Sequence, residues 1–185
     1  MKSELWETPK KKNTIKMRKC SAYPAYTESD ILTGHLNSVN DFVKYIDRVS
    51  EALKVTQFYD NLRNNLILNI NDLNIKKFIA LGIGKLTSYI SLIQFSLFVL
   101  LINEFKDKCE SLESFIFDPL LTELDMSILN KFGINLLDNK NGKYCYAGFH
   151  TIFLMLHCPY RLYNNVVWAN WNNLDKIVII GNRLC

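Results

Sequence analysis

The chain has 185 residues, of which 49% are hydrophobic and 22% are charged; this composition is typical of a single globular domain with a sizeable core and excludes a disordered protein. The net charge is +4, but residues 1–20 hold seven basic and two acidic side chains, so the other 165 residues carry a net charge of −1. Because the body is nearly neutral, it offers no broad basic surface, and we expect no direct binding of nucleic acid.

Five cysteines are scattered along the chain, at positions 20, 109, 145, 158 and 185, and no two of them form a CxxC pair. No apolar leader stands at the N-terminus. This pattern favours reduced thiols, and we therefore expect the protein in the cytoplasm and the nucleus.

Residues 1–35 are rich in lysine and lack apolar periodicity, which predicts a basic, disordered tail. The run Lys10-Lys11-Lys12 could be a nuclear-localisation or acidic-partner patch, and a solvated tail is the alternative. Residues 36–74 differ from the tail because their apolar side chains recur at helical spacing, and Ser38-x-x-Asp41 resembles a capping box. We predict an amphipathic helical segment there that packs on the body.

Residues 75–185 alternate between apolar strands and helices. The predicted strands are Phe78–Ile83, Phe115–Asp118, Ile134–Leu137, Ile152–Leu156 and Ile177–Ile180. The predicted helices are Leu86–Asn103, Glu123–Phe132 with a capping box at Thr122-x-x-Asp125, and a third helix opened by Pro159. This order predicts an α/β fold: a Rossmann-like three-layer sandwich with a mostly parallel five-stranded sheet, preceded by the amphipathic helical segment. Residues 138–151 lack a helix, and a strand order of 3-2-1-4-5 requires them to cross two strands.

The uncharged stretch of residues 86–103 reaches the length of a membrane-spanning helix. It nevertheless contains a polar stripe at helical spacing, formed by Thr87, Ser88, Ser91 and Gln94. Such a stripe is typical of a helix that packs on a sheet and keeps one special face, so we expect no membrane partner.

Polar or flexible residues follow four of the predicted strands at the point where each strand ends: Gly82, Gly84, Asp118, His157, Cys158, Gly181 and Asn182. Parallel strands bring their carboxyl ends to one edge of the sheet, and ligands bind at this edge in open α/β folds. We therefore predict that these seven residues form a binding site.

Two of these motifs each allow two interpretations. Gly82-x-Gly84 before a helix suits a phosphate-bearing nucleotide, but Thr87 replaces the third glycine of GxGxxG, and a tight strand-to-helix turn is the alternative. Asp118 could bind ribose hydroxyls or, before Pro119, form an Asx turn.

The triplet His157-Cys158-Pro159 is the most chemically suggestive part of the sequence. A thiol near a helix N-terminus and an imidazole is expected to have a lowered pKa, which suits a nucleophile, a thiolate ligand to haem iron or a redox sensor. Cys158 could instead pack as a small hydrophobic residue. A zinc site formed with Cys145 and His150 is conceivable, although its spacing fits no standard pattern.

The segment after Pro159 is rich in aromatic side chains. Tyr160, Asn164, Trp168 and Trp171 recur at i, i+4, i+8 and i+11, which places them on one stripe. Such a stripe is typical of core packing, and the neighbouring asparagines could orient a polar ligand.

Several blocks of the sequence resemble the Sensitivity to Red Light Reduced (SRR-like) domain family, and they occur in order over residues 75–183. They are Gly82-Ile83-Gly84 with Gln94, Phe117-Asp118-Pro119, Phe132-Gly133, Phe153 to Cys158, Leu162 to Asn165, Asn170-Trp171 and Val178 to Asn182. The resemblance implies an intracellular regulator in a circadian clock input pathway, with links to haem metabolism and clock-gene expression. It carries over no catalytic residues, and it implies that the chain stops at Cys185 where family members continue, so we expect a truncated copy with one sheet face partly bare.

The sequence therefore favours a non-enzymatic regulatory protein that works through protein partners not yet identified. The alternative is a Rossmann-like enzyme that binds a nucleotide or S-adenosylmethionine. Candidate cofactors are an adenosine-containing nucleotide and haem, bound at the carboxyl edge of the sheet.

Overall fold

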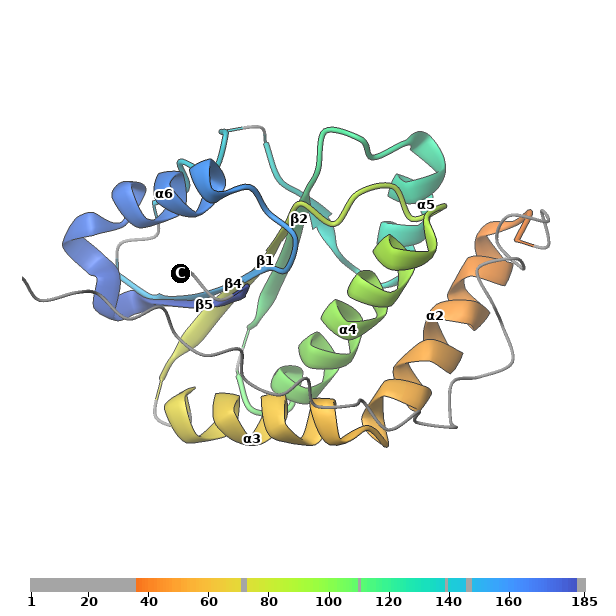
Figure 1. Cartoon of the computed structure of the whole chain (residues 1–185), viewed down its shortest axis with the longest axis horizontal. Helices are drawn as coiled ribbons and strands as arrows, with labels where there is room; N and C mark the ends of the chain where they lie inside the picture. The colour runs from red at the N-terminus through yellow and green to blue at the C-terminus, as the bar shows by residue number, and fades with distance from the viewer. Residues whose placement is uncertain (1–35, 71–72, 110, 139, 146–147, 183–185) are drawn as a thin grey trace, which may run out of the picture.

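The computed structural model describes residues 36–70, 73–109, 111–138, 140–145 and 148–182, so the predicted basic tail lies outside the described residues. Its elements are arranged around one sheet (Figure 1). In chain order they are α2 (Val39–Lys54), α3 (Gln57–Ile70), β1 (Ile75–Leu81), α4 (Tyr89–Lys106), β2 (Glu113–Phe117), α5 (Glu123–Lys131), β3 (Asn135–Leu136), β4 (His150–Met155), α6 (Tyr160–Ala169), the 3-10 helix η1 (Trp171–Lys176) and β5 (Ile177–Gly181).

The sheet has five strands in the order β3-β2-β1-β4-β5, and every neighbouring pair is parallel. In the central register, Phe78 of β1 lies between Ser114 of β2 and Ile152 of β4. The predicted α/β class is confirmed, and the strand order, which the sequence left open, is the one that requires residues 138–151 to cross two strands. The order reverses between β1 and β4, so the helices that follow these two strands leave toward opposite faces of the sheet.

Two hydrophobic clusters cover the two faces. Phe78 and Ala80 of β1 belong to the larger cluster, together with α2, α4 and α5, whereas Ile79 and Leu81 belong to the smaller cluster, together with α6. The alternation follows from the two-residue period of a strand. Figure 1 shows α2, α4 and α5 on one side of the sheet and α6 on the other.

Both predicted capping boxes are present. The Ser38 hydroxyl accepts a hydrogen bond from the Asp41 backbone N–H at the start of α2, and the Thr122 hydroxyl accepts one from the Asp125 N–H at the start of α5. In each case the carboxylate at the third helical position accepts a bond from the cap residue in return. These reciprocal bonds satisfy N–H groups that a helix start otherwise leaves unpaired.

Helix α4 passes the length and composition test for a membrane span, but 67% of the tested window is buried inside the protein. It packs against α2 and the sheet, and Phe95 and Phe98 lie at the centre of the larger cluster. The core helix of a folded domain passes the same test, so its hydropathy is explained by packing between the sheet and α2.

Two helices begin slightly later than the sequence indicated. Helix α4 starts at Tyr89 rather than Leu86, because residues 82–88 form the turn that leaves β1. Pro159 is the residue before the first turn of α6, with extended backbone dihedrals, rather than the first helical residue. Both shifts enlarge the loops at the carboxyl edge of the sheet.

A loop replaces the missing helix between β3 and β4. Tyr144, in the middle of this loop, is buried in the smaller cluster beside Ile79 and Phe153. The Asn170 side chain donates a hydrogen bond to the Tyr144 carbonyl at 2.6 Å and holds the loop against the end of α6. One aromatic side chain thus covers part of a face that a helix would otherwise cover.

The predicted core position of the aromatic stripe is wrong. Trp168 and Trp171 are 69% and 56% exposed, and Tyr160 is exposed as well. The two indole rings stack on each other with centroids 5.0 Å apart and an angle of 20° between their planes. The side chains of α6 that face the sheet are Tyr163 and Val166, which are offset from the stripe on the helix surface.

Candidate functional site

A cavity of about 950 Å³ opens at the carboxyl edge of the sheet, where the strand order reverses between β1 and β4. Its walls are the turn after β1, the start of α4, the segment after β2, the loop between β3 and β4, and the start of α6. This is the edge at which ligands bind in open α/β folds. Cavities of this volume accommodate small molecules and cofactors.

Four of the seven residues predicted for the site line this cavity: Gly82, Gly84, Asp118 and His157. The other three do not line it. Cys158 is buried beneath the turn, and Gly181 and Asn182 pack around Tyr163 at the end of β5. The edge predicted from the sequence thus carries a cavity, but three of the seven predicted residues do not line it.

Two carboxylates hold the turn between β1 and α4. Asp118 accepts a hydrogen bond from the Gly84 N–H at 2.8 Å, and Asp125 accepts one from the Leu86 N–H at 3.1 Å. Asp125 is fully buried, and its second oxygen accepts bonds from the backbone and hydroxyl of Thr122. A buried carboxylate with several donors is well satisfied, so these residues fix the backbone that forms the cavity wall.

Each glycine of the Gly-x-Gly turn has a local steric reason. Gly82 and Gly84 have φ angles of +70° and +82°, a region that L side chains rarely adopt. A Cβ at Gly82 would lie 2.7 Å from the sulfur of Cys158, and one at Gly84 would lie 2.7 Å from the hydroxyl of Ser91. The tight-turn interpretation is therefore sufficient to explain both glycines.

Of the two interpretations of Cys158 that the sequence allowed, the structure favours the packed small residue over the thiolate. The sulfur donates a hydrogen bond to the Leu81 carbonyl at 3.1 Å, and burial, with the nearby Asp118 carboxylate, raises the pKa of the thiol to about 12. Desolvation disfavours the charged form and outweighs the helix start nearby. Cys158 packs as a small hydrophobic residue, and its position does not fit a thiolate ligand to haem iron in the cavity.

Gly181 and Asn182 take part in a structural contact at the end of the sheet. The Tyr163 hydroxyl of α6 donates a hydrogen bond to the Met155 carbonyl and accepts one from the Asn182 N–H at 3.0 Å. Any side chain at Gly181 would collide with the Tyr163 ring. This contact joins the ends of β4 and β5 through α6.

The zinc hypothesis is not supported by the geometry. Among the residues that the structure describes, no three His, Cys, Asp or Glu side chains gather closely enough to hold a metal ion. His150 begins β4 at the opposite edge of the sheet from His157, which follows the end of that strand. The two histidines therefore cannot bind the same metal ion.

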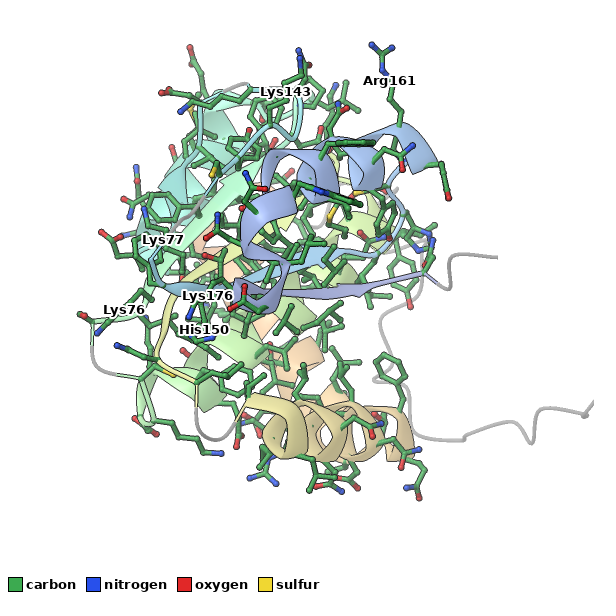
Figure 2. The ribbon with its side chains drawn as sticks, turned by 90° about the vertical axis from the view of Figure 1, so that its left-hand side faces the viewer. Lys76, Lys77, Lys143, His150, Arg161 and Lys176 are labelled. Atoms are coloured by element: carbon green, nitrogen blue, oxygen red, sulfur yellow. The ribbon has the colours of Figure 1, made fainter. Side chains whose placement is uncertain are left out.

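The cavity also has polar and charged lining residues that were not predicted as site residues, among them Ser91, Gln94, Lys143 and Arg161. Figure 2 shows Lys143 and Arg161 at the same end of the molecule, on the loop after β3 and on α6 respectively. The polar stripe of α4 was the signal for Ser91 and Gln94. No sequence pattern pointed to the two cations, because the loop that carries Lys143 reaches α6 only through tertiary contacts.

One such contact is made by Asn165 of α6, whose side chain donates a hydrogen bond to the Asn141 carbonyl at 2.6 Å. Gly142 follows with a φ angle of +78°, and a Cβ there would lie 2.6 Å from a methyl carbon of Leu162. The loop therefore packs closely on α6, and this packing places Lys143 over the cavity.

Comparison with known proteins identifies the family. The SRR1 domain matches residues 51–185, which include the whole sheet and every wall of the cavity. The chain belongs to the SRR1 domain family. This confirms the resemblance recognised in the sequence, and membership is consistent with a regulatory protein of the SRR1 type.

Three relatives of the SRR1 family match this chain over part of their own length. It is 39% identical over 83 residues to the SRR1-like protein of Mus musculus, covering 42% of this chain and 33% of the relative. It is 29% identical over 145 residues to Protein SENSITIVITY TO RED LIGHT REDUCED 1 of Arabidopsis thaliana, covering 74% and 52%. It is 27% identical over 112 residues to the SRR1-like protein of Drosophila melanogaster, covering 58% and 39%. The chain thus spans about half or less of these relatives, and no solved structure matches it.

Proposed function

We propose that this SRR1-family chain is a non-enzymatic regulatory protein of the clock-input type, with links to haem metabolism and clock-gene expression. It would act in the cytoplasm and the nucleus through protein partners, without a membrane and without direct contact to nucleic acid. Family membership supports a regulatory role, and the clock and haem links come from the resemblance. The name of the Arabidopsis relative refers to a reduced sensitivity to red light.

One observation about the site carries the non-enzymatic part of the proposal. The cavity is large enough for a small ligand, yet Cys158, the side chain that the sequence marked as reactive, is a buried thiol with a pKa of about 12. A protonated thiol is a poor nucleophile at neutral pH. The arrangement suits a protein that holds a ligand and changes its contacts with partners, rather than one that transforms the ligand.

A reporter experiment tests this role. The protein would be expressed in cells that lack their own SRR1-family protein, and the rhythm of a clock-gene reporter would be recorded. We expect rescue by the natural protein and equal rescue by Cys158→Ser, which keeps a small hydrogen-bonding side chain at this position. Failure of the natural protein to change the rhythm would contradict the clock role, and loss of rescue by a folded Cys158→Ser variant would indicate thiol chemistry.

The alternative is a Rossmann-like enzyme that binds a nucleotide or S-adenosylmethionine. It is favoured by the strand order and by the cavity at the Gly82-x-Gly84 turn. A thermal-shift screen with S-adenosylmethionine, NAD(P), ATP and haemin tests it, since a ligand at 100 times its dissociation constant adds about 2.7 kcal/mol of stability. Conversion of the bound ligand into a product would support the enzyme, whereas binding without conversion would support the regulator.

A further inference from the structure

The side chains around the cavity give it a positive rim. Lys143 and Arg161 line it, and neither makes an ion pair with any of the described residues. Asp118 is the single acidic side chain in the described lining, and its two oxygens accept the backbone N–H groups of Gly84 and Leu120. The charge that remains unpaired at the cavity is positive and favours an anionic ligand.

Two helices direct their N-termini to the same cavity. Residues of the first turns of α4 and α6 line it, and neither helix has a side-chain cap, in contrast to the capping boxes of α2 and α5. Within the described part of the chain, the backbone N–H groups of Tyr89, Ile90 and Tyr160 have no hydrogen-bond partner. Unpaired N–H groups and the positive end of the helix dipole both attract anions.

A second and independent observation comes from two buried side chains of α4. Ser91 and Gln94 are only 7% and 6% exposed, both line the cavity, and neither side chain makes a hydrogen bond to a described residue. The amide oxygen of Gln94 is completely buried and unpaired. Buried polar groups are nearly always paired in folded proteins, and leaving one unpaired is costly. The Ser91 hydroxyl and the Gln94 amide nitrogen are not among the fully buried atoms, and a ligand in the cavity would supply their missing partners.

We propose that the cavity binds a small molecule that carries a phosphate group at one end and a hydroxyl group at the other. The phosphate lies between the N-termini of α4 and α6 near Arg161 and Lys143, and the hydroxyl group pairs with the Ser91 hydroxyl and the Gln94 amide nitrogen deeper in the cavity. This inference rests on the proposed regulatory function, because it concerns the same cavity. The regulator would then sense a phosphorylated metabolite.

The observations favour a phosphate over the other candidate ligands. S-adenosylmethionine carries a positive sulfonium, which the two helix N-termini and the two cations would repel. Cys158, the thiolate ligand that the sequence suggested for haem iron, does not reach the cavity, so a haem there would depend on His157. A phosphate can take several N–H donors at once from a helix start and from a guanidinium, whose planar fork matches its oxygens.

Binding of defined probes tests the proposal. The melting temperature of the purified chain would be measured with ADP, inorganic pyrophosphate, adenosine and succinate at constant ionic strength. We expect ADP and pyrophosphate to raise the melting temperature, ADP by several degrees at about 100 times its dissociation constant, and adenosine and succinate to raise it much less. No shift with ADP and pyrophosphate at millimolar concentration, or equal shifts with adenosine or succinate, would overturn the proposal.

Charge variants locate the phosphate group. The double variant Lys143→Gln and Arg161→Gln should weaken ADP binding about a hundredfold, because two charge-assisted hydrogen bonds to the phosphate are lost. The matched control removes two exposed lysines elsewhere, by Lys106→Gln and Lys131→Gln. Equal loss of binding in both double variants would mean that only general charge matters and would overturn the assigned position.

A substitution of Gln94 separates a role in ligand binding from a role in the fold, because the melting temperature of the free protein and the affinity for ADP should change in different ways. Gln94→Met replaces an unpaired polar group by an apolar one of similar shape, so the free protein should melt at an unchanged or higher temperature while ADP binding weakens several-fold. A lower melting temperature with unchanged ADP binding would show that Gln94 serves the fold and not the ligand. Because these measurements use the chain alone, they can fail while the reporter rescue succeeds, or succeed while it fails.

Discussion

The carboxylate of Asp118 accepts a hydrogen bond from the backbone N–H of Gly84 at 2.8 Å and so joins the segment after β2 to the turn after β1. Its other oxygen accepts the N–H of Leu120 at 2.8 Å, which is the Asx turn that the sequence allowed as an alternative. Both oxygens thus already serve the backbone. Asp118 positions the wall of the cavity, whether or not it also contacts a ligand.

Asp118→Asn tests this positioning role. The carboxamide keeps the shape of the side chain but places an NH₂ group against one of the two N–H donors. We expect a loss of about 1–3 kcal/mol in the free energy of unfolding, because a nearly buried donor is left unpaired. Chemical denaturation measures it, with Asp47→Asn on the exposed side of α2 as the control. Equal losses of unfolding free energy in the two variants would show that the hydrogen bonds of Asp118 do not stabilise the fold more than an exposed carboxylate does.

Cys158 should resist alkylation in the folded protein. Its thiol pKa is raised to about 12 by burial and by Asp118, so the reactive thiolate is scarce at pH 8, whereas Cys145 is exposed. Peptide mass spectrometry after treatment with iodoacetamide should find Cys145 modified and Cys158 unmodified until denaturant is added. Because the folded pKa lies above the unfolded value, the stability linked to this thiol is present below about pH 8.5 and is lost as the pH rises toward 12. Rapid modification of Cys158 in the folded chain would contradict this assignment.

Tyr163→Phe should destabilise the end of the sheet. The hydroxyl bridges the Met155 carbonyl and the Asn182 N–H, and its loss would leave both backbone groups without this partner. We expect a decrease of about 1–3 kcal/mol in the free energy of unfolding. Tyr160→Phe, at an exposed position on the same helix, is the matched control and should stay within about 0.5 kcal/mol. If the control loses as much as Tyr163→Phe, the bridge is not what stabilises this edge.

The fold could be predicted from the sequence because its signals are local. The strand-forming runs, the capping boxes at Ser38 and Thr122, and Gly133 after α5 each depend on a few neighbouring residues. The same local signals located the carboxyl edge of the sheet, since every parallel strand ends there. The polar stripe of α4 also indicated a special face, and Ser91 and Gln94 lie on the cavity.

The parts that could not be predicted depend on tertiary contacts. The sequence left open whether Cys158 is activated by the helix start beside it or packs as a small residue, and its burial against Leu81, which raises its pKa, follows only from the tertiary fold. Lys143 reaches the cavity because Gly142 and Asn141 pack on α6. No pattern in the sequence predicts this packing. The aromatic stripe was assigned to the core because its period fits a helix, and a period does not say which face meets the sheet.

The ion pair between Arg63 of α3 and Glu104 of α4 should make stability depend on pH. The guanidinium lies 2.8 Å from the carboxylate, and its hydrogen bond lowers the pKa of Glu104. Because the folded pKa lies below the unfolded value of about 4.3, the stabilisation is present above that value and is lost as the pH falls. Arg63→Gln should therefore cost up to about 1 kcal/mol at pH 7, since the pair is partly exposed, and less near pH 3.5.

Arg161→Gln, which removes a charge without an ion pair to any described residue, serves as the control for this pH dependence. Denaturant melts at the two pH values measure both variants. A cost for Arg63→Gln that is the same at both values would mean that the arginine stabilises α3 by packing rather than by charge.

The exposed indole stack on α6 and η1 should contribute little to stability. Trp168 and Trp171 contact each other and face solvent, whereas Phe95 is fully buried in the larger cluster and packs edge-on against Phe132 at 5.7 Å. Trp168→Ala should cost at most about 1 kcal/mol, the range measured for an aromatic pair beyond its buried area. Phe95→Ala should cost about 3–5 kcal/mol because it leaves a cavity. A loss for Trp168→Ala close to that for Phe95→Ala, measured by denaturation, would show that the stripe is buried in the folded protein in solution.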